Sequence, residues 1–153
     1  MKIIDVVAER NYSVVVGANG PDEIKSISAE HRKVLLVAPT ALIKLFKLKE
    51  SKNLSIISTP AGENQKSIKV LESVWRKCAA VGIERSDAII GFGGGATTDL
   101  AGFAAATWLR GIDWYAMPTS LAGMVDASIG GKTGLNSQSG KNLIGSFYSP
   151  RSV

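Results

Sequence analysis

A glycine-rich turn near the middle of the 153-residue chain holds the residues with the clearest chemical meaning. An apolar segment, Ala-Ile-Ile-Gly-Phe at 88–92, ends in three adjacent glycines at 93–95, and an alanine-rich segment follows. Adjacent glycines let a backbone approach a ligand, because no Cβ stands in the way. A helix that begins there directs its free N–H groups at the same point, which favours an anion such as a pyrophosphate. The turn therefore predicts a nucleotide site.

The same turn satisfies a dinucleotide-binding pattern. Residues 91–96, Gly-Phe-Gly-Gly-Gly-Ala, fit G-x-G-x-x-G/A, with Asp113 as the acid downstream. That pattern normally opens the first strand–helix unit of its domain, whereas two or more such units precede it here. A plain tight turn is the alternative. Under either interpretation we place Asp99 early in the following helix, where it caps the helix or accepts a hydrogen bond from a ribose.

A second polar segment begins an amphipathic helix. Residues 60–66 read Pro-Ala-Gly-Glu-Asn-Gln-Lys, and Glu63 and Lys66 share a face if they are helical. An ordinary surface pair is the alternative. The loops after the strands of an open α/β sheet gather at one edge. We therefore expect the segments 61–66, 93–99 and 119–120 to face one crevice.

A third segment sets lysines beside glycines between Asp126 and Asn142. Gly131-Lys132 and Gly140-Lys141 differ from a solvated helix face, because glycine lets the backbone fold tightly and directs the ammonium into a shared space. Together with Asn136, these groups suit a substrate that bears phosphate or carboxylate. Polar surface loops are the alternative.

The elements that position these segments alternate between strands and helices. Strands are expected at Ile3–Val7, Tyr12–Val16, Lys33–Val37, Leu54–Ser58, Ala88–Phe92 and Trp114–Met117. Helices are expected from Gly20, over Thr40–Leu48, over Ile68–Val81 with Gly82 closing it, and over Asp99–Leu109. This order predicts an α/β fold, an open and mostly parallel sheet with helices on both faces. We assign no strand or helix after Pro118, where glycine becomes dense.

Composition narrows the class of protein. At 45% hydrophobic and 20% charged residues, the chain reads as one domain with enough length for a core. We expect no membrane span, no signal peptide and no membrane partner. The single cysteine, Cys78, lies on an apolar helix stripe and suits the reducing cytoplasm. With His31 as the only histidine, no metal site is predicted.

The charge of the chain favours a small acidic ligand. The net charge of +5 suits an anionic substrate. The densest basic run, four lysines within 44–52, is interpreted as a solvated face, and no nucleic-acid partner is expected.

Five blocks in order resemble 3-dehydroquinate synthase. They span 93–103, 107–111, 118–121, 125–136 and 140–147, and 61–66 anchors a looser resemblance before Ala88. The resemblance implies the Rossmann-like, NAD-binding N-terminal domain of that family. We expect the family's C-terminal domain, helical and metal-binding, to be missing from this chain. Residues 1–153 are therefore expected to form one truncated NAD-binding domain.

The resemblance also implies a role for each motif. Two loops and four further residues would bind NAD: Ala61, Gly62, Glu63, Asn64, Gln65, Lys66, Gly94, Gly95, Ala96, Thr97, Thr98, Asp99, Thr119, Ser120, Lys132 and Lys141. Thr98 replaces a common glycine, a change that a helix start accepts because threonine caps. The catalytic set at the junction of cofactor and substrate would be Asp126, Lys132, Lys141 and Asn142. Arg110 would reach the substrate of a neighbouring subunit in the family's dimer.

The family's reaction belongs to the shikimate pathway of aromatic amino acid biosynthesis. Its members convert 3-deoxy-arabino-heptulosonate 7-phosphate, a sugar phosphate, to 3-dehydroquinate and phosphate. NAD transiently oxidises an alcohol, and a divalent metal, zinc or cobalt, polarises that oxygen. The glutamate and two histidines that bind this metal have no counterpart here, and Ala38-Pro39-Thr40 stands where the family often has an aspartate for the ribose. We therefore expect no turnover by this chain alone.

Other interpretations stay open on the sequence. The chain also fits a sugar phosphate cyclase of the inosose or valiolone type, an ordinary Rossmann dehydrogenase, or a non-catalytic, vestigial nucleotide-binding module. A homodimer or a complementing C-terminal polypeptide would supply the missing wall of the site.

Overall fold

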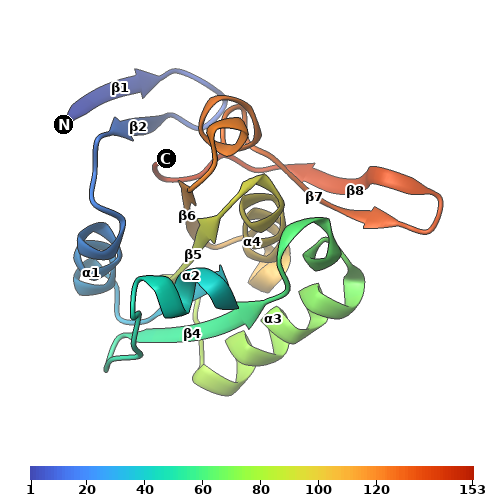
Figure 1. The fold of residues 1–153 in the computed structure, drawn as a ribbon, viewed down its shortest axis with the longest axis horizontal. Coiled ribbons are helices and arrows are strands. Elements are labelled where there is room, and N and C mark those ends of the chain that lie inside the picture. The colour runs from blue at the N-terminus through green and yellow to red at the C-terminus, as the bar shows by residue number, and fades with distance from the viewer.

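The computed structural model describes residues 1–153, and a four-stranded parallel sheet lies at its centre (Figure 1). Its strands are β3 (Val34–Pro39), β4 (Leu54–Thr59), β5 (Ala88–Gly93) and β6 (Asp113–Pro118), in the order β4-β3-β5-β6. Every residue of β3 and β5 is buried, since uninterrupted apolar runs suit strands covered on both faces. The predicted parallel α/β sheet is confirmed.

Helices cover both faces of this sheet. They are α1 (Gly20–Glu30) and α2 (Thr40–Leu45) on one face, and α3 (Ile68–Val81) and α4 (Gly95–Thr107) on the other. Alternate residues of β3 serve the two cores, so that Leu36 belongs with α1 and Leu35 with α3 and α4. The predicted α3 is confirmed, including Gly82, which ends it at φ 68°. None of the helices combines the length and apolar composition that crossing a bilayer requires.

The strand order reverses between β3 and β5. The chain runs from β3 outward to β4, then returns past β3 to β5 and continues to β6. Ligands of open α/β sheets bind in the crevice at such a reversal, beyond the carboxyl ends of the strands. The loops that follow β4, β5 and β6 all begin at this edge.

An antiparallel hairpin at the start of the chain forms as predicted. It consists of β1 (Lys2–Val6) and β2 (Tyr12–Val16). Residues 151–153, where no element is predicted, lie between this hairpin and β6 and bridge in parallel to both. The Val153 N–H donates to the Ser13 carbonyl at 2.9 Å. The last three residues therefore attach the hairpin to the central sheet.

The region after Pro118 is regular, which corrects the prediction that it holds no element. It contains a short π-helix, η3 (Gly123–Ala127), and a hairpin of β7 (Lys132–Ser137) and β8 (Gly140–Phe147). Gly134 pairs with Gly145, and a Cβ on either would collide with the backbone of the opposite strand. The glycines that resemble loop residues in the sequence instead allow two strands to approach closely.

The boundaries of two predicted helices are wrong. The helix expected over 40–48 ends at Leu45, because the chain turns at Lys47 with φ 50°. The helix expected from Asp99 begins at Gly95, since Gly94 is extended and already serves as its N-cap. It ends at Thr107 and passes into a 3-10 turn, η2 (Trp108–Arg110).

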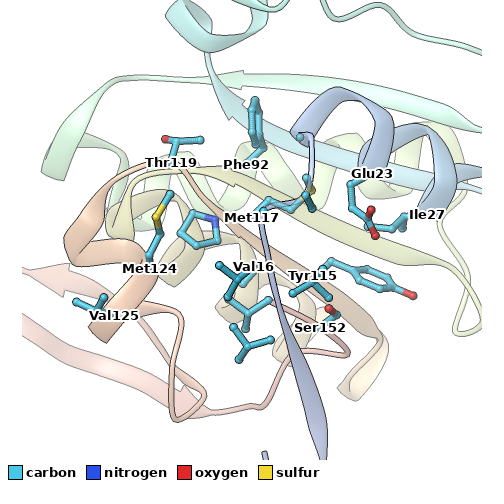
Figure 2. A pocket seen from close by; sticks show the side chains of 18 of the residues that line it. Val16, Glu23, Ile27, Phe92, Tyr115, Met117, Thr119, Met124, Val125 and Ser152 are labelled. Carbon is cyan, nitrogen blue, oxygen red and sulfur yellow. The ribbon is translucent and has the colours of Figure 1, made fainter. Parts of the chain in front are cut away.

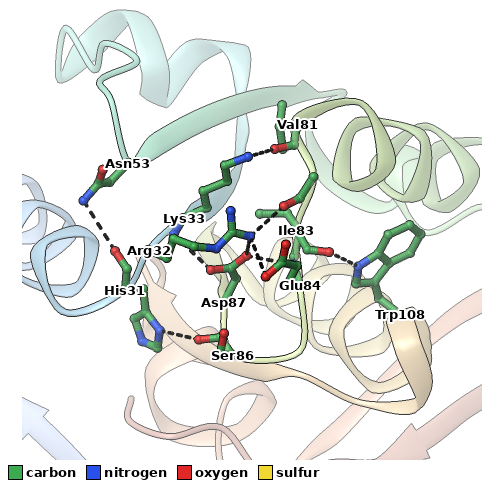
Figure 3. Close-up of polar contacts among 11 residues, drawn as sticks. His31, Arg32, Lys33, Asn53, Val81, Ile83, Glu84, Ser86, Asp87 and Trp108 are labelled. Atoms are coloured by element: carbon green, nitrogen blue, oxygen red, sulfur yellow. Dashed lines mark hydrogen bonds and ion pairs between the residues drawn. The ribbon is translucent and has the colours of Figure 1, made fainter.

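A buried carboxylate fastens the amino edge of the sheet, opposite the crevice (Figure 3). Asp87 is fully buried and accepts from Arg32 Nη2 at 2.5 Å. It also accepts from the backbone N–H groups of Lys33 at 3.0 Å and Glu84 at 2.7 Å. This set of donors compensates the buried charge, so Asp87 ties the starts of β3 and β5 together.

Candidate functional site

The site is built around the turn between β5 and α4. Gly94 adopts φ −72° and ψ 179°, and no side chain caps the helix that follows. The first N–H groups of α4 therefore have no partner within the helix. A Cβ on Gly93 would lie 2.7 Å from Thr97 Cβ, and one on Gly95 would lie 2.8 Å from Ala127 Cβ. Only glycine allows the turn to close this tightly.

The turn fits the pyrophosphate of NAD. A Cβ on Gly94 would meet only Ser120 Oγ within 4 Å, at 3.5 Å, so the space above the helix start is open. Gly94, Gly95 and Ala96 are half-buried there. The Thr97 hydroxyl beneath them is buried without a hydrogen-bond partner. Free N–H groups at the positive end of a helix favour an anion.

A buried ion pair joins the loop after β4 to α4. Lys66 Nζ lies 2.5 Å from Asp99 Oδ2, and the two side chains are 3% and 18% exposed. Burial raises the pKa of the Asp99 carboxyl above its ordinary value, and the nearby Lys66 ammonium opposes this rise. The charges of Glu63 and Asp126 raise the same pKa further, so four ionisable groups act on one another at this point.

Neither Asp99 nor Thr98 caps α4, which corrects both predictions. The helix starts at Gly95, so Asp99 lies in its second turn and its carboxylate turns to Lys66. The Thr98 hydroxyl donates back to the Gly95 carbonyl at 3.0 Å. Because the helix starts four residues earlier than predicted, both side chains lie within the helix and not at its cap. Asp99 there contacts Lys66, and Thr98 contacts the preceding turn of the helix.

The loop after β4 forms a 3-10 turn, η1 (Gly62–Gln65), preceded by the exposed Ala61. Gln65 is buried and braces the turn, since its amide donates to the Gly62 carbonyl at 3.0 Å and accepts from Thr59 at 3.1 Å. Asn64 is exposed. Glu63 and Lys66 point to different partners, so the surface pair considered above is not formed.

The β7–β8 hairpin closes the other side of the crevice. Lys66 Nζ also donates to the side-chain oxygen of Asn142, the third residue of β8. Asn142 has φ 57°, a left-handed conformation that asparagine tolerates better than most residues. Lys66 therefore contacts both α4 and the hairpin. The contact with α4 agrees with the expected convergence of 61–66 and 93–99, whereas the hairpin was not part of that expectation.

A cavity of about 480 Å³ lies between α4, η3 and the hairpin. Four of the predicted site residues line it, Asp99, Asp126, Lys132 and Asn142. The Lys132 ammonium lies 3.7 Å from the Asp126 carboxylate, and both side chains are largely exposed. The cavity thus offers one cation, two carboxylates and an amide to a polar ligand.

A second and larger cavity, about 520 Å³, lies on the α1 side of β6 (Figure 2). Its lining is mainly apolar, with Phe92, Met117 and Met124 among the side chains, and it includes Thr119. The Thr119 N–H donates to the Gly93 carbonyl at 2.8 Å. Ser120 accepts from the backbone N–H of a glycine in η3 at 3.2 Å. The loop 119–120 therefore reaches the crevice, as predicted.

Three predicted residues lie away from the lined cavity. Lys141 is exposed and lies next to Asn142 on β8, but it does not line the cavity. Arg110, with φ 67°, follows the carboxyl end of α4 and is exposed near the amino edge of the sheet. Asp113 begins β6 at that same edge and pairs with Arg10 at 2.5 Å, so it is not a ribose-binding acid for the glycine turn.

No set of three or more histidine, cysteine, aspartate or glutamate side chains is grouped so as to hold a metal ion. His31 instead contacts the Tyr115 hydroxyl at 3.0 Å and the Ser86 carbonyl at 3.2 Å. Cys78 is buried in the core, and burial raises the pKa of its thiol to about 12. The residues of this chain do not fit the family's divalent metal.

The family of this chain follows from its similarity to known proteins. A family model described as "3-dehydroquinate synthase N-terminal" matches residues 56–153. The chain belongs to the 3-dehydroquinate synthase family. A 3-dehydroquinate synthase from Cutibacterium acnes is 42% identical over 153 residues, which cover all of this chain and 42% of that relative. The chain therefore spans less than half the length of the relatives that it matches.

Solved structures of sugar phosphate cyclases are similar as well. A 2-deoxy-scyllo-inosose synthase, solved with carbaglucose-6-phosphate, NAD+ and Co2+, has a TM-score of 0.83 and 25% identity, over 99% of this chain and 45% of that chain. A 2-epi-5-epi-valiolone synthase from Streptomyces hygroscopicus, with NAD+ and Zn2+ bound, has a TM-score of 0.80 and 26% identity, over 97% and 44% of the two chains. These similarities confirm the Rossmann-like fold.

One residue at the site goes beyond the prediction. The sequence predicts for Asn136 only a group suited to substrate, but its amide contacts Glu63 and the backbone of Asn142. The spacing of asparagines along the hairpin is the only signal for it in the sequence. The contacts themselves depend on the pairing of β7 with β8, which no pattern in the sequence predicts.

Proposed function

We propose that this chain is the NAD+-binding part of a 3-dehydroquinate synthase, the enzyme that converts 3-deoxy-arabino-heptulosonate 7-phosphate to 3-dehydroquinate and phosphate. The observation that carries the proposal is the convergence of the loop after β4, the start of α4 and the β7–β8 hairpin on Lys66. This convergence creates a crevice with an anion-binding helix start on one side and a lined polar cavity on the other.

The dinucleotide would lie along the carboxyl edge of the sheet. Residues 94–99 would hold the pyrophosphate, with 61–66 and 119–120 on either side. When bound, NAD+ supplies a reversible hydride acceptor for a substrate alcohol. The protein's own part is to fix the orientation of the cofactor, for which the buried Lys66–Asp99 pair provides a rigid base.

The sugar phosphate would enter the cavity of about 480 Å³. Lys132, and Lys141 from the neighbouring strand, suit the carboxylate and phosphate of the substrate, because ammonium groups stabilise charge as phosphate departs. Asn142 would orient a hydroxyl, and Asp126 would hold Lys132 in place from 3.7 Å. The net charge of +5 favours the approach of such an anion.

The rest of the site would come from a complementing C-terminal polypeptide, joined to this chain or separate. Large apolar side chains beside both cavities are exposed, including Leu121, Val125, Leu143 and Phe147. Exposed apolar groups of this size mark surfaces that pack against protein. Arg110 lies far enough from the crevice to serve a neighbouring copy in a homodimer. The buried, single cysteine fits a cytoplasmic location.

A sugar phosphate cyclase of the inosose type is the second candidate, because the structure of such an enzyme is similar over 99% of this chain. The identity of 42% with a 3-dehydroquinate synthase, against 25% with the inosose synthase, favours the first candidate. The two differ in substrate, whereas both need the same NAD+ crevice.

Calorimetric titration with NAD+ tests the proposal. Gly94→Val is expected to abolish binding, since its side chain would fill the space above the start of α4 while φ −72° suits valine. Ala122→Val, at an exposed position before η3, is the control and is expected to bind NAD+ normally. Circular dichroism would confirm that both variants fold. Equal NAD+ affinity of wild type and Gly94→Val, or no binding by wild type, would overturn the proposal.

The reaction itself is tested with the C-terminal part of a related synthase added as a second polypeptide. Phosphate release from 3-deoxy-arabino-heptulosonate 7-phosphate, without net reduction of NAD+, is the expected result. Net reduction of NAD+ would instead support an ordinary dehydrogenase, and release only from a glucose phosphate would support an inosose synthase.

A further inference from the structure

Asn136 connects the two walls of the crevice. Its side-chain amide donates from Nδ2 to Glu63 Oε2 at 2.7 Å, across to the η1 loop. Its Oδ1 accepts from the backbone N–H of Asn142 at 3.0 Å, on the neighbouring strand. Its own backbone N–H donates to the Lys66 carbonyl at 2.9 Å. One residue thus uses three polar groups to join two parts of the site, the loop after β4 and strand β8.

The contact with Asn142 fixes an unusual backbone. The register of the β7–β8 pair shifts between Leu135 and Ser137, so Asn136 lies in the irregularity. Across from it, Asn142 has φ 57°, a conformation that costs free energy outside glycine. The Asn136 Oδ1 satisfies the N–H that this conformation would otherwise leave without a strand partner. The side chain of Asn142 is then directed at Lys66.

The contact with Glu63 fixes the other wall. Glu63 is exposed and lies in a 3-10 turn of four residues, with no ion pair to hold it. The bond from Asn136 Nδ2 is therefore the contact that orients its carboxylate. A carboxylate in this place accepts but cannot donate, so the donor must be the amide nitrogen.

The structure assigns to Asn136 the role of a positioning residue, which holds Glu63 and Asn142 in a fixed relation across the NAD+ crevice. This assignment rests on the proposed function for its effect on NAD+. It replaces the expectation that Asn136 serves the substrate directly, since its amide is already engaged on both sides. Asn136 acts through two other residues and is not itself a catalytic residue.

Exchanging donor and acceptor tests the assignment. Asn136→Asp keeps the oxygen that faces Asn142 but sets a second carboxylate against Glu63, so NAD+ affinity is expected to fall about fivefold. Adding Glu63→Gln restores the hydrogen bond in the opposite direction, because the new amide at position 63 donates to the new carboxylate at position 136. The double variant is therefore expected to bind NAD+ as tightly as Glu63→Gln alone. A merely structural loss would not be rescued in this way.

The pH dependence of NAD+ affinity supplies a second readout. Two carboxylates at hydrogen-bond distance share a proton once the pH falls, so the affinity of Asn136→Asp is expected to recover between about pH 8 and about pH 5. Gln138→Glu, which adds the same charge at an exposed position of the hairpin, is the control. Its affinity for NAD+, relative to wild type, is expected to stay constant with pH.

Two outcomes would overturn the assignment while NAD+ binding by wild type stands. One is an affinity of Asn136→Asp equal to that of Gln138→Glu, and the other is a double variant that binds NAD+ less tightly than Glu63→Gln alone. If wild type binds no NAD+, the proposed function fails, and a double-mutant cycle in urea decides the assignment alone. Additive free energies of unfolding for Asn136→Asp and Glu63→Gln would then refute it.

Discussion

Replacing Lys66 by methionine removes the buried cation of the crevice while keeping most of its apolar stem. The lysine side chain is 3% exposed and its partner Asp99 is 18% exposed, at a separation of 2.5 Å. Breaking a fully buried pair by removing one partner costs about 3–5 kcal/mol. Because Asp99 keeps some access to water, we expect Lys66→Met to lower the free energy of unfolding by about 3 kcal/mol at neutral pH.

The loss of stability in Lys66→Met is expected to increase as the pH rises. Burial already raises the folded-state pKa of Asp99 above 3.8, the ordinary value. A carboxyl of this kind contributes stability that is present below its unfolded pKa and is lost as pH rises through its folded pKa. Removing Lys66 removes the charge that opposes the rise, so the folded pKa increases further. The defect of Lys66→Met is therefore largest near neutral pH and shrinks toward about pH 4.

Urea unfolding without ligand, followed by tryptophan fluorescence at several pH values, measures this effect. Lys69→Met, at an exposed position in the first turn of α3, is the matched control and is expected to change stability little. The double variant Lys66→Met with Asp99→Asn is expected to be more stable than Lys66→Met alone, because no unpaired charge remains. A loss of unfolding free energy in Lys66→Met that is small, or constant with pH, would show that the Lys66 ammonium does not stabilise the Asp99 carboxylate, and would refute the prediction.

Three further predictions concern the glycine turn, the core and the last three residues. Gly93→Ala is expected to lower stability by about 1–3 kcal/mol in thermal unfolding, because its Cβ would overlap Thr97; an unchanged melting temperature would contradict this. Cys78, with its pKa raised to about 12, is expected to react with a thiol reagent only after unfolding, and rapid labelling of the native protein would be inconsistent with its burial. Val153→Pro removes the N–H bonded to Ser13, so amide exchange is expected to accelerate in β1 and β2 but not in β3 or β5.

Most of the central fold could be predicted because local sequence and tertiary burial agree there. The run at 34–37 is apolar without interruption, and the strand it forms is buried on both faces. The three- and four-residue spacing before Gly82 likewise defines both the buried face of α3 and its end. In these elements each residue type suits the structure regardless of distant contacts.

The β7–β8 hairpin could not be predicted on the same grounds. Its strands contain Gly134 and Gly145, which have low intrinsic preference for strands, and most of β8 is exposed, so no alternation of apolar residues marks it. The glycines become favourable only when they face each other, a condition set by pairing rather than by either segment. The start of α4 differs from the prediction for a related reason, since Gly94 and Gly95 have the residue type of a loop although Gly95 begins the helix.

At the site, the residue types indicated a crevice but not its internal contacts. Lys66 meets Asp99 across 33 positions of the sequence and Asn142 across 76. Neither its burial nor the choice of partner is visible in spacing, because a lysine at a helix start is usually exposed. The role of Asn136 depends in turn on both of these contacts.

The placement of residues 151–153 between β2 and β6 has a consequence for how the protein folds during its synthesis. The strands that leave the ribosome first gain their backbone pairing to the central sheet only when these much later residues emerge. Contacts between such distant parts of a chain form late, since the intervening loop must close first. We expect the doubly wound centre to assemble around β3 and β5 while the N-terminal hairpin waits, an order that pulsed hydrogen exchange during refolding would reveal as late protection of β1 and β2.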